Sequence, residues 1–325
     1  MKKTILVIGL GSMGQRRIRI LKALRPECTI IGIDKDKTRA EQAKQEYGID
    51  ICSSISDVKP PIYAAFICTS PESHPGLTTT CLQNGCHVFS EINLLDTGYE
   101  ENLKLAQTQG KTLFLSSTPL YKEEIQYIIQ KSQENRDKKI YIYHVGQYLP
   151  DWHPWDNLDD FFVSRKATNG CRELLAIELP WITAAFGKIE SVSVTKANFS
   201  HLGLSFPDTY AIQASHSDGT VGIIIIDVVS RKAVRRFEAY NDSMYLSWEG
   251  TPASLLEKDM ESGEERTVVL GSYIHDERYG AFVNEAAYVK ELEEFFAAVE
   301  GKKPLYSFTQ DQEIIRLINT IEENP

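Results

Sequence analysis

The sequence lacks the features of a membrane protein, a disulfide-linked protein or a nucleic-acid binder. No apolar run approaches the roughly 20 residues that span a bilayer, and the apolar core of the start, MKKTILVIGLGSMG, is too short for a secretory signal. The six cysteines form no C-x-x-C pair and no zinc spacing. The net charge of -10 argues against a nucleic-acid or membrane binder, because binding to phosphate backbones or membrane surfaces needs a clustered positive field. We expect a cytoplasmic protein with reduced cysteines and no metal, nucleic-acid or membrane partner.

The sequence pattern changes partway along the chain. Apolar strand-like runs at 4–8, 29–34, 64–69, 87–91 and 112–117 alternate with helical patterns, which is typical of a parallel sheet covered on both faces. After about residue 138, strand patterns separated by turn residues dominate, with helical patterns near 171–186 and at the C-terminus.

With 325 residues, two domains are expected. The fold class is α/β: a Rossmann doubly wound parallel sheet over 1–120, then an α+β domain with an open, mainly antiparallel sheet over 121–325. The C-terminal helix could pack back on the Rossmann domain.

The stretch GLGSMG follows the first predicted strand and opens a helix. Its glycines have the G-x-G-x-x-G spacing, which allows a tight turn, close approach of a pyrophosphate and close packing of helix on strand. The amides at the helix start then bind negative phosphates. The sequence therefore predicts a dinucleotide-binding loop formed by Gly9, Gly11, Ser12, Met13 and Gly14.

Asp34 closes the second predicted strand, 20 residues after Gly14. An acid here accepts hydrogen bonds from the adenosine ribose and repels a 2'-phosphate, which favours NAD over NADP. Lys35 and Lys37 could pair with that phosphate, so NADP is not excluded.

The chain resembles the Gfo/Idh/MocA oxidoreductases, the family of glucose-fructose oxidoreductase and inositol dehydrogenase. The matching pieces are VIGLGSMGQRRIR, ICTSPESHP, GCHVFSEINL, TNGCRELLAIELPWITAAFG and the C-terminal segment from VKELEEFF onward, in the family's order. The resemblance implies a Rossmann domain followed by a domain whose open sheet lines the substrate site and often serves in oligomer contacts. A homodimer or homotetramer is therefore expected.

The resemblance also implies further cofactor contacts. Thr69, Ser70 and His74, in the loop after the strand at 64–69, should lie along the dinucleotide, and Glu91 near the nicotinamide ribose. Loops at the carboxyl ends of parallel strands are where such sheets bind ligands, which agrees. The alternative for His74 is a helix-start residue without ligand contact.

Two positions depart from the family pattern. Active dehydrogenases of the family usually carry Glu-Lys-Pro where this chain has Glu91-Ile92-Asn93, so the lysine that orients or protonates the reacting oxygen is absent. Ile177 stands where the catalytic histidine is expected, although a shifted register would place Glu178 there. The family's aspartate falls at or beside Glu173, the one plausible acid at that position.

Hydride transfer to or from an alcohol carbon needs a group that moves the hydroxyl proton. The segment HVGQYLPDWHPWDNLDDFF offers substitutes, with His153 the first choice and Tyr148 the second; Glu173 is a third candidate. The two tryptophans of this segment stand beside polar groups, as in a sugar-binding surface. The alternative is that the segment is a packed loop or a subunit contact. Arg172 with Glu173 suits an anionic substrate, or an internal salt bridge. Other titratable groups in the segment are His144, Asp151 and Asp156.

Together these patterns predict an NAD(P)-dependent oxidoreductase that transfers a hydride between nicotinamide and a sugar or sugar derivative, including a nucleotide sugar. The alternative is a non-catalytic homologue that binds a dinucleotide or sugar as a sensor or partner protein. Loss of both usual catalytic groups fits that alternative, whereas the glycine loop, Asp34 and Glu91 fit a retained cofactor.

Overall fold

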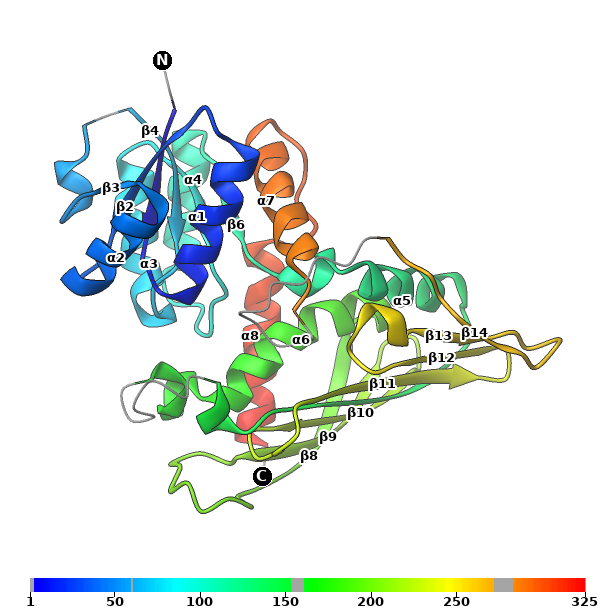
Figure 1. The fold of residues 1–325 in the computed structure, drawn as a ribbon. Coiled ribbons are helices and arrows are strands. Elements are labelled where there is room, and N and C mark those ends of the chain that lie inside the picture. Colours follow the sequence, from blue (N-terminus) through cyan, green and yellow to red (C-terminus); the bar gives the residue numbers. More distant parts are fainter. Residues whose placement is uncertain (1–2, 60, 153–160, 272–282, 325) are drawn as a thin grey trace. The chain divides into compact units, whose positions relative to one another are not determined.

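The computed structural model describes residues 3–59, 61–152, 161–271 and 283–324. The chain forms two compact units (Figure 1). The first, termed the Rossmann unit, consists of Met1–Ser117 and Tyr288–Glu313. The second, termed the antiparallel-sheet unit, consists of Thr118–Ala287 and Ile314–Pro325. Both units are therefore discontinuous in the sequence. No helix in the described ranges is long and apolar enough to cross a bilayer.

The Rossmann unit contains a six-stranded parallel sheet with the order β3-β2-β1-β4-β5-β6. The order reverses between β1 and β4, so the ligand-binding edge lies at the carboxyl ends of these strands. The predicted doubly wound sheet is confirmed, except that the short β3 was not expected. The strands are β1 (Thr4–Ile8), β2 (Thr29–Ile33), β3 (Asp50–Ile51), β4 (Ile62–Ile67), β5 (His87–Ser90) and β6 (Leu113–Leu115).

Helices cover both faces of this sheet. The side chains of Cys81 and Leu82 from α3 (His74–Gln83), and of Ala106 from α4 (Tyr99–Gln109), belong to the apolar cluster on one face. On the other face, Phe295 of α7 (Glu285–Val299) packs against Phe66, Phe89 and Phe114, with ring centroids 5.2 to 5.8 Å apart. The helices α1 (Ser12–Leu24) and α2 (Lys37–Tyr47) follow β1 and β2.

The antiparallel-sheet unit contains an eight-stranded sheet with the order β14-β13-β12-β11-β7-β10-β9-β8. Its neighbours pair antiparallel, apart from the parallel pair β7 and β10, which confirms the predicted mainly antiparallel sheet. The strands are β7 (Ile140–Gly146), β8 (Ile189–Ala197), β9 (Thr209–His216), β10 (Val221–Asp227), β11 (Val234–Asn241), β12 (Met244–Trp248), β13 (Leu256–Lys258) and β14 (Glu265–Thr267).

One face of this sheet is covered by α6 (Gly170–Phe186), which also packs against α5 (Glu123–Glu134). Tyr141 of β7 stacks on Phe186 with ring centroids 4.3 Å apart, and Tyr143 meets Trp181 edge to face. The other face, termed the outer face, carries exposed isoleucines because alternate residues of a strand point to opposite sides. The last helix, α8 (Phe308–Glu323), contributes residues to both units.

Candidate functional site

The glycine loop joins β1 to α1 in a conformation that requires glycine. Gly9 has φ of 90°, and a Cβ on it would lie 2.7 Å from the carbonyl oxygen of Cys68. A Cβ on Gly14 would lie 1.9 Å from the carbonyl oxygen of Gly9, so α1 can pack on the loop only with glycine there. Among the described residues, a Cβ on Gly11 would meet a single atom within 4 Å, Arg39 Nη1 at 3.8 Å, which leaves space above the loop for a ligand.

The start of α1 has the properties of an anion site. Ser12 and Met13 lie in the first turn, whose amides have no partner within the helix. Within the described residues, Gly11 supplies no side-chain cap and the first turn carries no acidic side chain that would compete with a phosphate. The open space at Gly11 and these amides fit the pyrophosphate of a dinucleotide.

Asp34 lies at the carboxyl end of β2 and braces the glycine loop. Its Oδ2 accepts a hydrogen bond from the amide of Leu10 at 2.7 Å, and its Oδ1 accepts one from the amide of Asp36 at 2.8 Å. Arg39 of α2 lies beside it, with Nη1 3.6 Å from Asp34 Oδ2. The predicted position of Asp34 next to the glycine loop is therefore observed, together with a cation that the sequence reasoning did not consider.

His74, at the start of α3, ties together the loops that follow β4 and β5. Its ring is buried, with Nε2 2.9 Å from the carbonyl oxygen of Thr69 and Nδ1 2.7 Å from the side-chain oxygen Oδ1 of Asn93. Burial lowers the pKa of His74, which favours the neutral ring. A neutral ring has a single N–H, so it donates to one of these two oxygens at a time. Both ring nitrogens are occupied, whereas Ser70 is exposed at the same edge.

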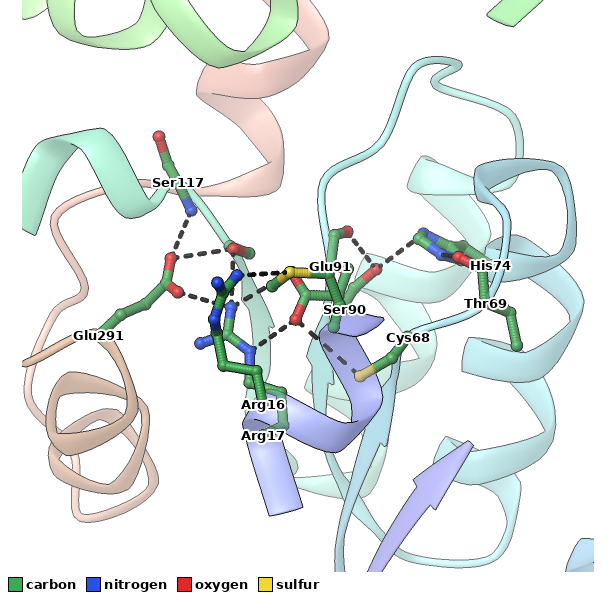
Figure 2. A network of polar contacts seen from close by, with 11 residues as sticks. Arg16, Arg17, Cys68, Thr69, His74, Ser90, Glu91, Ser117 and Glu291 are labelled. Carbon is green, nitrogen blue, oxygen red and sulfur yellow. Dashed lines mark hydrogen bonds and ion pairs between the residues drawn. The ribbon is translucent and has the colours of Figure 1, made fainter. Parts of the chain in front are cut away.

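Glu91 follows β5 and forms a buried ion pair with Arg17 of α1 (Figure 2). Arg17 Nε donates to Glu91 Oε1 at 2.6 Å, and Nη2 donates to Oε2 at 3.2 Å. Nη2 also donates to Glu291 of α7 at 2.7 Å. Ser116 Oγ and the Ser117 amide donate to the other oxygen of Glu291, at 3.0 and 2.7 Å. In this arrangement Glu91 fixes the end of β5 to α1, and contact with a nicotinamide ribose stays a prediction.

The guanidinium of Arg17 binds two buried carboxylates, those of Glu91 and Glu291. Burial raises the pKa of Glu291, and the nearby Arg17 opposes that shift. Burial and the charge of Glu91 raise the pKa of the Cys68 thiol, whose sulfur lies 3.9 Å from Glu91. Cys68 is therefore a neutral thiol at neutral pH.

In the antiparallel-sheet unit, Glu173 and Ile177 lie one turn apart on α6 and share one face of the helix. From Gly170 to Ile182, all of which the structure describes, they are the two residues that are only partly buried, while the others are buried. The Oε2 atom of Glu173 is covered and has no hydrogen-bond partner in the described part of the chain. Burial raises the pKa of Glu173 to about 7.

Glu178 is fully engaged within its own unit. Its Oε2 accepts from the Tyr143 hydroxyl and from Trp181 Nε1, both at 2.7 Å, and its Oε1 accepts from Arg235 at 2.6 Å. Glu178 is buried and holds α6 on the sheet, so the shifted register offers no free base. Arg172 likewise pairs with Glu322 at 2.5 Å and with Asn319 at 2.7 Å. It therefore forms an internal salt bridge, but with Glu322 and not with Glu173, the residue considered with it from the sequence.

Two candidates of the segment HVGQYLPDWHPWDNLDDFF have partners within the antiparallel-sheet unit. Tyr148 packs its ring against Arg231, whose guanidinium carbon lies 4.0 Å from the ring centroid. His144 Nε2 lies 2.7 Å from Asp227 Oδ2. His153 and Asp156 lie outside the described residues. The described residues include no cluster of three or more metal-ligating side chains.

Sequence reasoning missed Arg17, Arg39 and Glu291. Arg39 could have been noticed, because it follows Asp34 by five residues near the start of the next predicted helix. Arg17 follows Gly14 by three residues, but the residues around it in the sequence do not indicate a buried ion pair. Glu291 carried no local signal, since its partner lies 274 positions away.

A parallel sheet with a glycine loop, an acid after β2 and a second, mainly antiparallel sheet defines a two-unit dinucleotide-binding protein. Residues 3–117 match the Gfo/Idh/MocA family, described as an oxidoreductase family with an NAD-binding Rossmann fold. For residues 3–117, this match confirms the resemblance stated from the sequence. No curated protein matches the sequence.

Solved structures share the fold over the whole chain. UDP-N-acetylglucosamine 3-dehydrogenase GnnA from Acidithiobacillus ferrooxidans is 15% identical, with 100% of this chain and 98% of that chain covered and a TM-score of 0.78. A levoglucosan dehydrogenase in complex with NADH and L-sorbose is 12% identical, with 99% and 96% covered and a TM-score of 0.83. A biliverdin reductase from Synechocystis sp. PCC 6803, in complex with biliverdin and NADP+, is 15% identical, with 99% and 98% covered and a TM-score of 0.77. At these identities the likeness shows the fold.

Proposed function

We propose that this protein is an NAD(P)-dependent oxidoreductase that transfers a hydride between nicotinamide and a sugar or sugar derivative. The observation that carries the proposal is the glycine loop at the start of α1, in a segment that belongs to an NAD-binding oxidoreductase family. Two solved structures with this fold are dehydrogenases of a nucleotide sugar and of an anhydrosugar. The fold also occurs in a biliverdin reductase, so the choice of a sugar needs its own experiment.

The chain would hold the dinucleotide through the glycine loop. The first-turn amides of Ser12, Met13 and Gly14 would donate to the pyrophosphate, and Asp34 would orient the loop through the Leu10 amide. The nicotinamide, when bound, accepts or donates the hydride. Thr69 and Ser70, at the carboxyl end of β4, are proposed to lie along the cofactor, with His74 holding their loop in place.

Glu173 is the proposed proton-handling residue. A general acid or base works best when its pKa lies near the operating pH, and burial brings the pKa of Glu173 to about 7. As an alcohol is oxidised, its C–H hydrogen leaves with two electrons as hydride while its hydroxyl proton passes to the Glu173 carboxylate. Ketone reduction reverses both transfers. Ile177, one turn away, keeps an apolar side chain beside this face of α6, which preserves the raised pKa.

The decisive experiment combines cofactor binding with turnover. The purified protein should bind NADH and oxidise or reduce at least one member of a panel of sugars and nucleotide sugars. Glu173→Gln should lower kcat by about 100-fold or more, as expected for loss of a general base, while NADH affinity stays unchanged. Glu190→Gln, an exposed glutamate of β8, is the matched control. Full activity in Glu173→Gln would redirect the assignment to Tyr148 or His153.

Binding of NADH without turnover across the whole panel would instead favour the non-catalytic alternative. No specific contact favours that reading, since the departures at Ile92 and Ile177 leave Glu173 with a pKa suited to proton transfer.

Homo-oligomer formation through the outer face is part of the proposal. Ile140 and Ile142 of β7 and Ile223 of β10 are 44%, 39% and 37% exposed, and Ile142 is the register partner of Ile223. Neighbouring exposed isoleucines at the centre of a sheet form an apolar patch suited to burial against a second copy. A cytoplasmic location also stays a proposal.

A further inference from the structure

A cationic side chain, that of Arg39, lies beside Asp34 in the proposed dinucleotide site. From the sequence, Asp34 alone was expected to determine the choice between NAD and NADP. Arg39 is 46% exposed at its side chain, whereas the Asp34 side chain is 7% exposed. Arg39 Nη1 lies 3.6 Å from Asp34 Oδ2, and Nη2 lies 3.7 Å from Asp36 Oδ2. Both distances exceed a hydrogen bond, so the guanidinium N–H groups are not committed to these carboxylates.

The Arg39 guanidinium also lies close to Gly11 of the glycine loop. Its Nη1 is the one atom within 4 Å of a Cβ built on Gly11 among the described residues. Gly11 is where the backbone approaches the pyrophosphate, and the end of β2 is where the adenosine ribose lies in this fold. Arg39 therefore borders the expected position of the ribose 2' substituent.

Asp34 is poorly placed to reject a 2'-phosphate. One of its oxygens accepts from the Leu10 amide and the other from the Asp36 amide, which compensates part of its charge. Arg39 compensates more of it. Residues 34 to 39 contain three cationic side chains, those of Lys35, Lys37 and Arg39, and two carboxylates. The local field at the end of β2 is therefore not negative.

We propose that Arg39 is a specificity-determining residue that admits a ribose 2'-phosphate, so that this protein binds NADP(H) and NAD(H) with comparable affinity. An arginine binds phosphate through two parallel N–H donors, and turning from Asp34 toward a 2'-phosphate breaks no short hydrogen bond. With NAD(H), Arg39 stays beside Asp34. The inference rests on the proposed dinucleotide site.

Binding measurements test this without any substrate. NADH and NADPH are titrated into the full chain by calorimetry, and 2'-AMP is compared with 5'-AMP as a competitor. We expect the two Kd values to agree within about tenfold. Arg39→Ala should weaken NADPH binding and 2'-AMP competition by about tenfold or more, the effect of one charge-assisted phosphate contact. NADH affinity should change by less than about threefold.

Two further variants control for side effects. Lys44→Ala removes another exposed cation of α2 and should leave both affinities unchanged. Arg39→Lys keeps the charge without the two-point geometry and should retain part of the NADPH affinity. The inference is overturned if the wild type binds NADH more than about tenfold more tightly than NADPH. It is also overturned if Arg39→Ala lowers the affinities for NADH and NADPH equally. Binding of NADH but not NADPH leaves the proposed function standing, whereas binding of neither overturns both.

Discussion

Arg17 and Glu91 form a two-point ion pair in which Arg17 Nε lies 2.6 Å from Glu91 Oε1 and Nη2 lies 3.2 Å from Oε2. The pair joins α1, which follows the glycine loop, to the end of β5. Because Glu291 of α7 binds the same guanidinium, one buried cation connects three distant parts of the chain. The carboxylate that resembles the family's Glu-Lys-Pro motif therefore has a structural partner in this protein.

Arg17→Met should destabilise the protein strongly, because Glu91 and Glu291 would remain buried without their cation. Removing one partner of a buried ion pair costs about 3 to 5 kcal/mol. We expect the free energy of unfolding in urea at neutral pH to fall by about this amount. Lys44→Met, on the exposed side of α2, should change it by less than about 0.5 kcal/mol. Equal stability of the two variants would contradict a structural role for the pair.

Alanine at two glycines of the loop should separate folding from binding. A Cβ on Gly14 would overlap the Gly9 carbonyl, so Gly14→Ala should lower Tm and abolish NADH binding together. Gly11→Ala has room in the protein but would occupy the path of the pyrophosphate. It should keep Tm while weakening NADH binding by about tenfold or more. Gly76→Ala in α3, with nothing nearby, is the control, and normal binding by Gly11→Ala would refute the proposed cofactor position.

The activity should depend on pH through Glu173. Alcohol oxidation needs the carboxylate, so kcat/KM for oxidation should rise with pH and level off above about 7. Ketone reduction needs the protonated carboxylic acid, so kcat/KM for reduction should fall as the pH rises through about 7. Both limbs should disappear from the residual activity of Glu173→Gln. A profile that keeps its inflection near pH 7 in this variant would assign the titration to another group.

The free energy of unfolding should also depend on the titration of Glu173, and it should decrease as the pH rises. The pKa of Glu173 rises on folding from 4.5 to about 7, so the folded state binds this proton more tightly than the unfolded state. Its stabilising contribution is complete below pH 4.5 and is lost as the pH rises through about 7. Wild-type stability relative to Glu173→Gln should therefore decline over this interval in urea titrations. A constant difference between the two proteins would mean that Glu173 titrates normally.

Ile142→Arg should dissociate the proposed oligomer, because a charge at the centre of the outer face opposes burial of the neighbouring isoleucines. Light scattering after size-exclusion chromatography should report a smaller mass than for the wild type at equal concentration. Glu41→Arg, on the exposed surface of α2, should leave the mass unchanged. An unaltered mass for Ile142→Arg would exclude this face as the main contact.

Most of the fold could be predicted from the sequence because its signals are local. Apolar runs, glycines and the change of pattern between the halves indicated both sheets, and G-x-G-x-x-G located the loop. The strand β3, of two residues, leaves too little pattern to be recognised. The helix α5 begins at Glu123, after a short 3-10 turn at Thr118–Tyr121 that has no clear signal in the sequence.

The chemistry of the site was less predictable, since it depends on partners distant in the sequence. Glu178 could be read as a displaced catalytic group until Tyr143 and Arg235 were found to occupy its oxygens. Glu173 and Ile177 lie on the partly exposed side of α6. The mostly apolar sequence of this helix does not reveal that side, because the side is set by the sheet on which the helix packs. Asp34 could be assigned to the ribose from its spacing, whereas the hydrogen bonds that occupy it come from its own loop.

The contacts of α7 with the parallel sheet also bear on how the protein is made. When residues 1–117 have left the ribosome, Phe66, Phe89 and Phe114 still lack Phe295, and Arg17 still lacks Glu291, because both are translated some 170 residues later. Through this interval of synthesis the nascent Rossmann segment exposes an aromatic surface and a cation missing one of its carboxylates. The aromatic packing on this face of the sheet is therefore completed only when α7 is translated, even though the dinucleotide loop is complete within the first 14 residues.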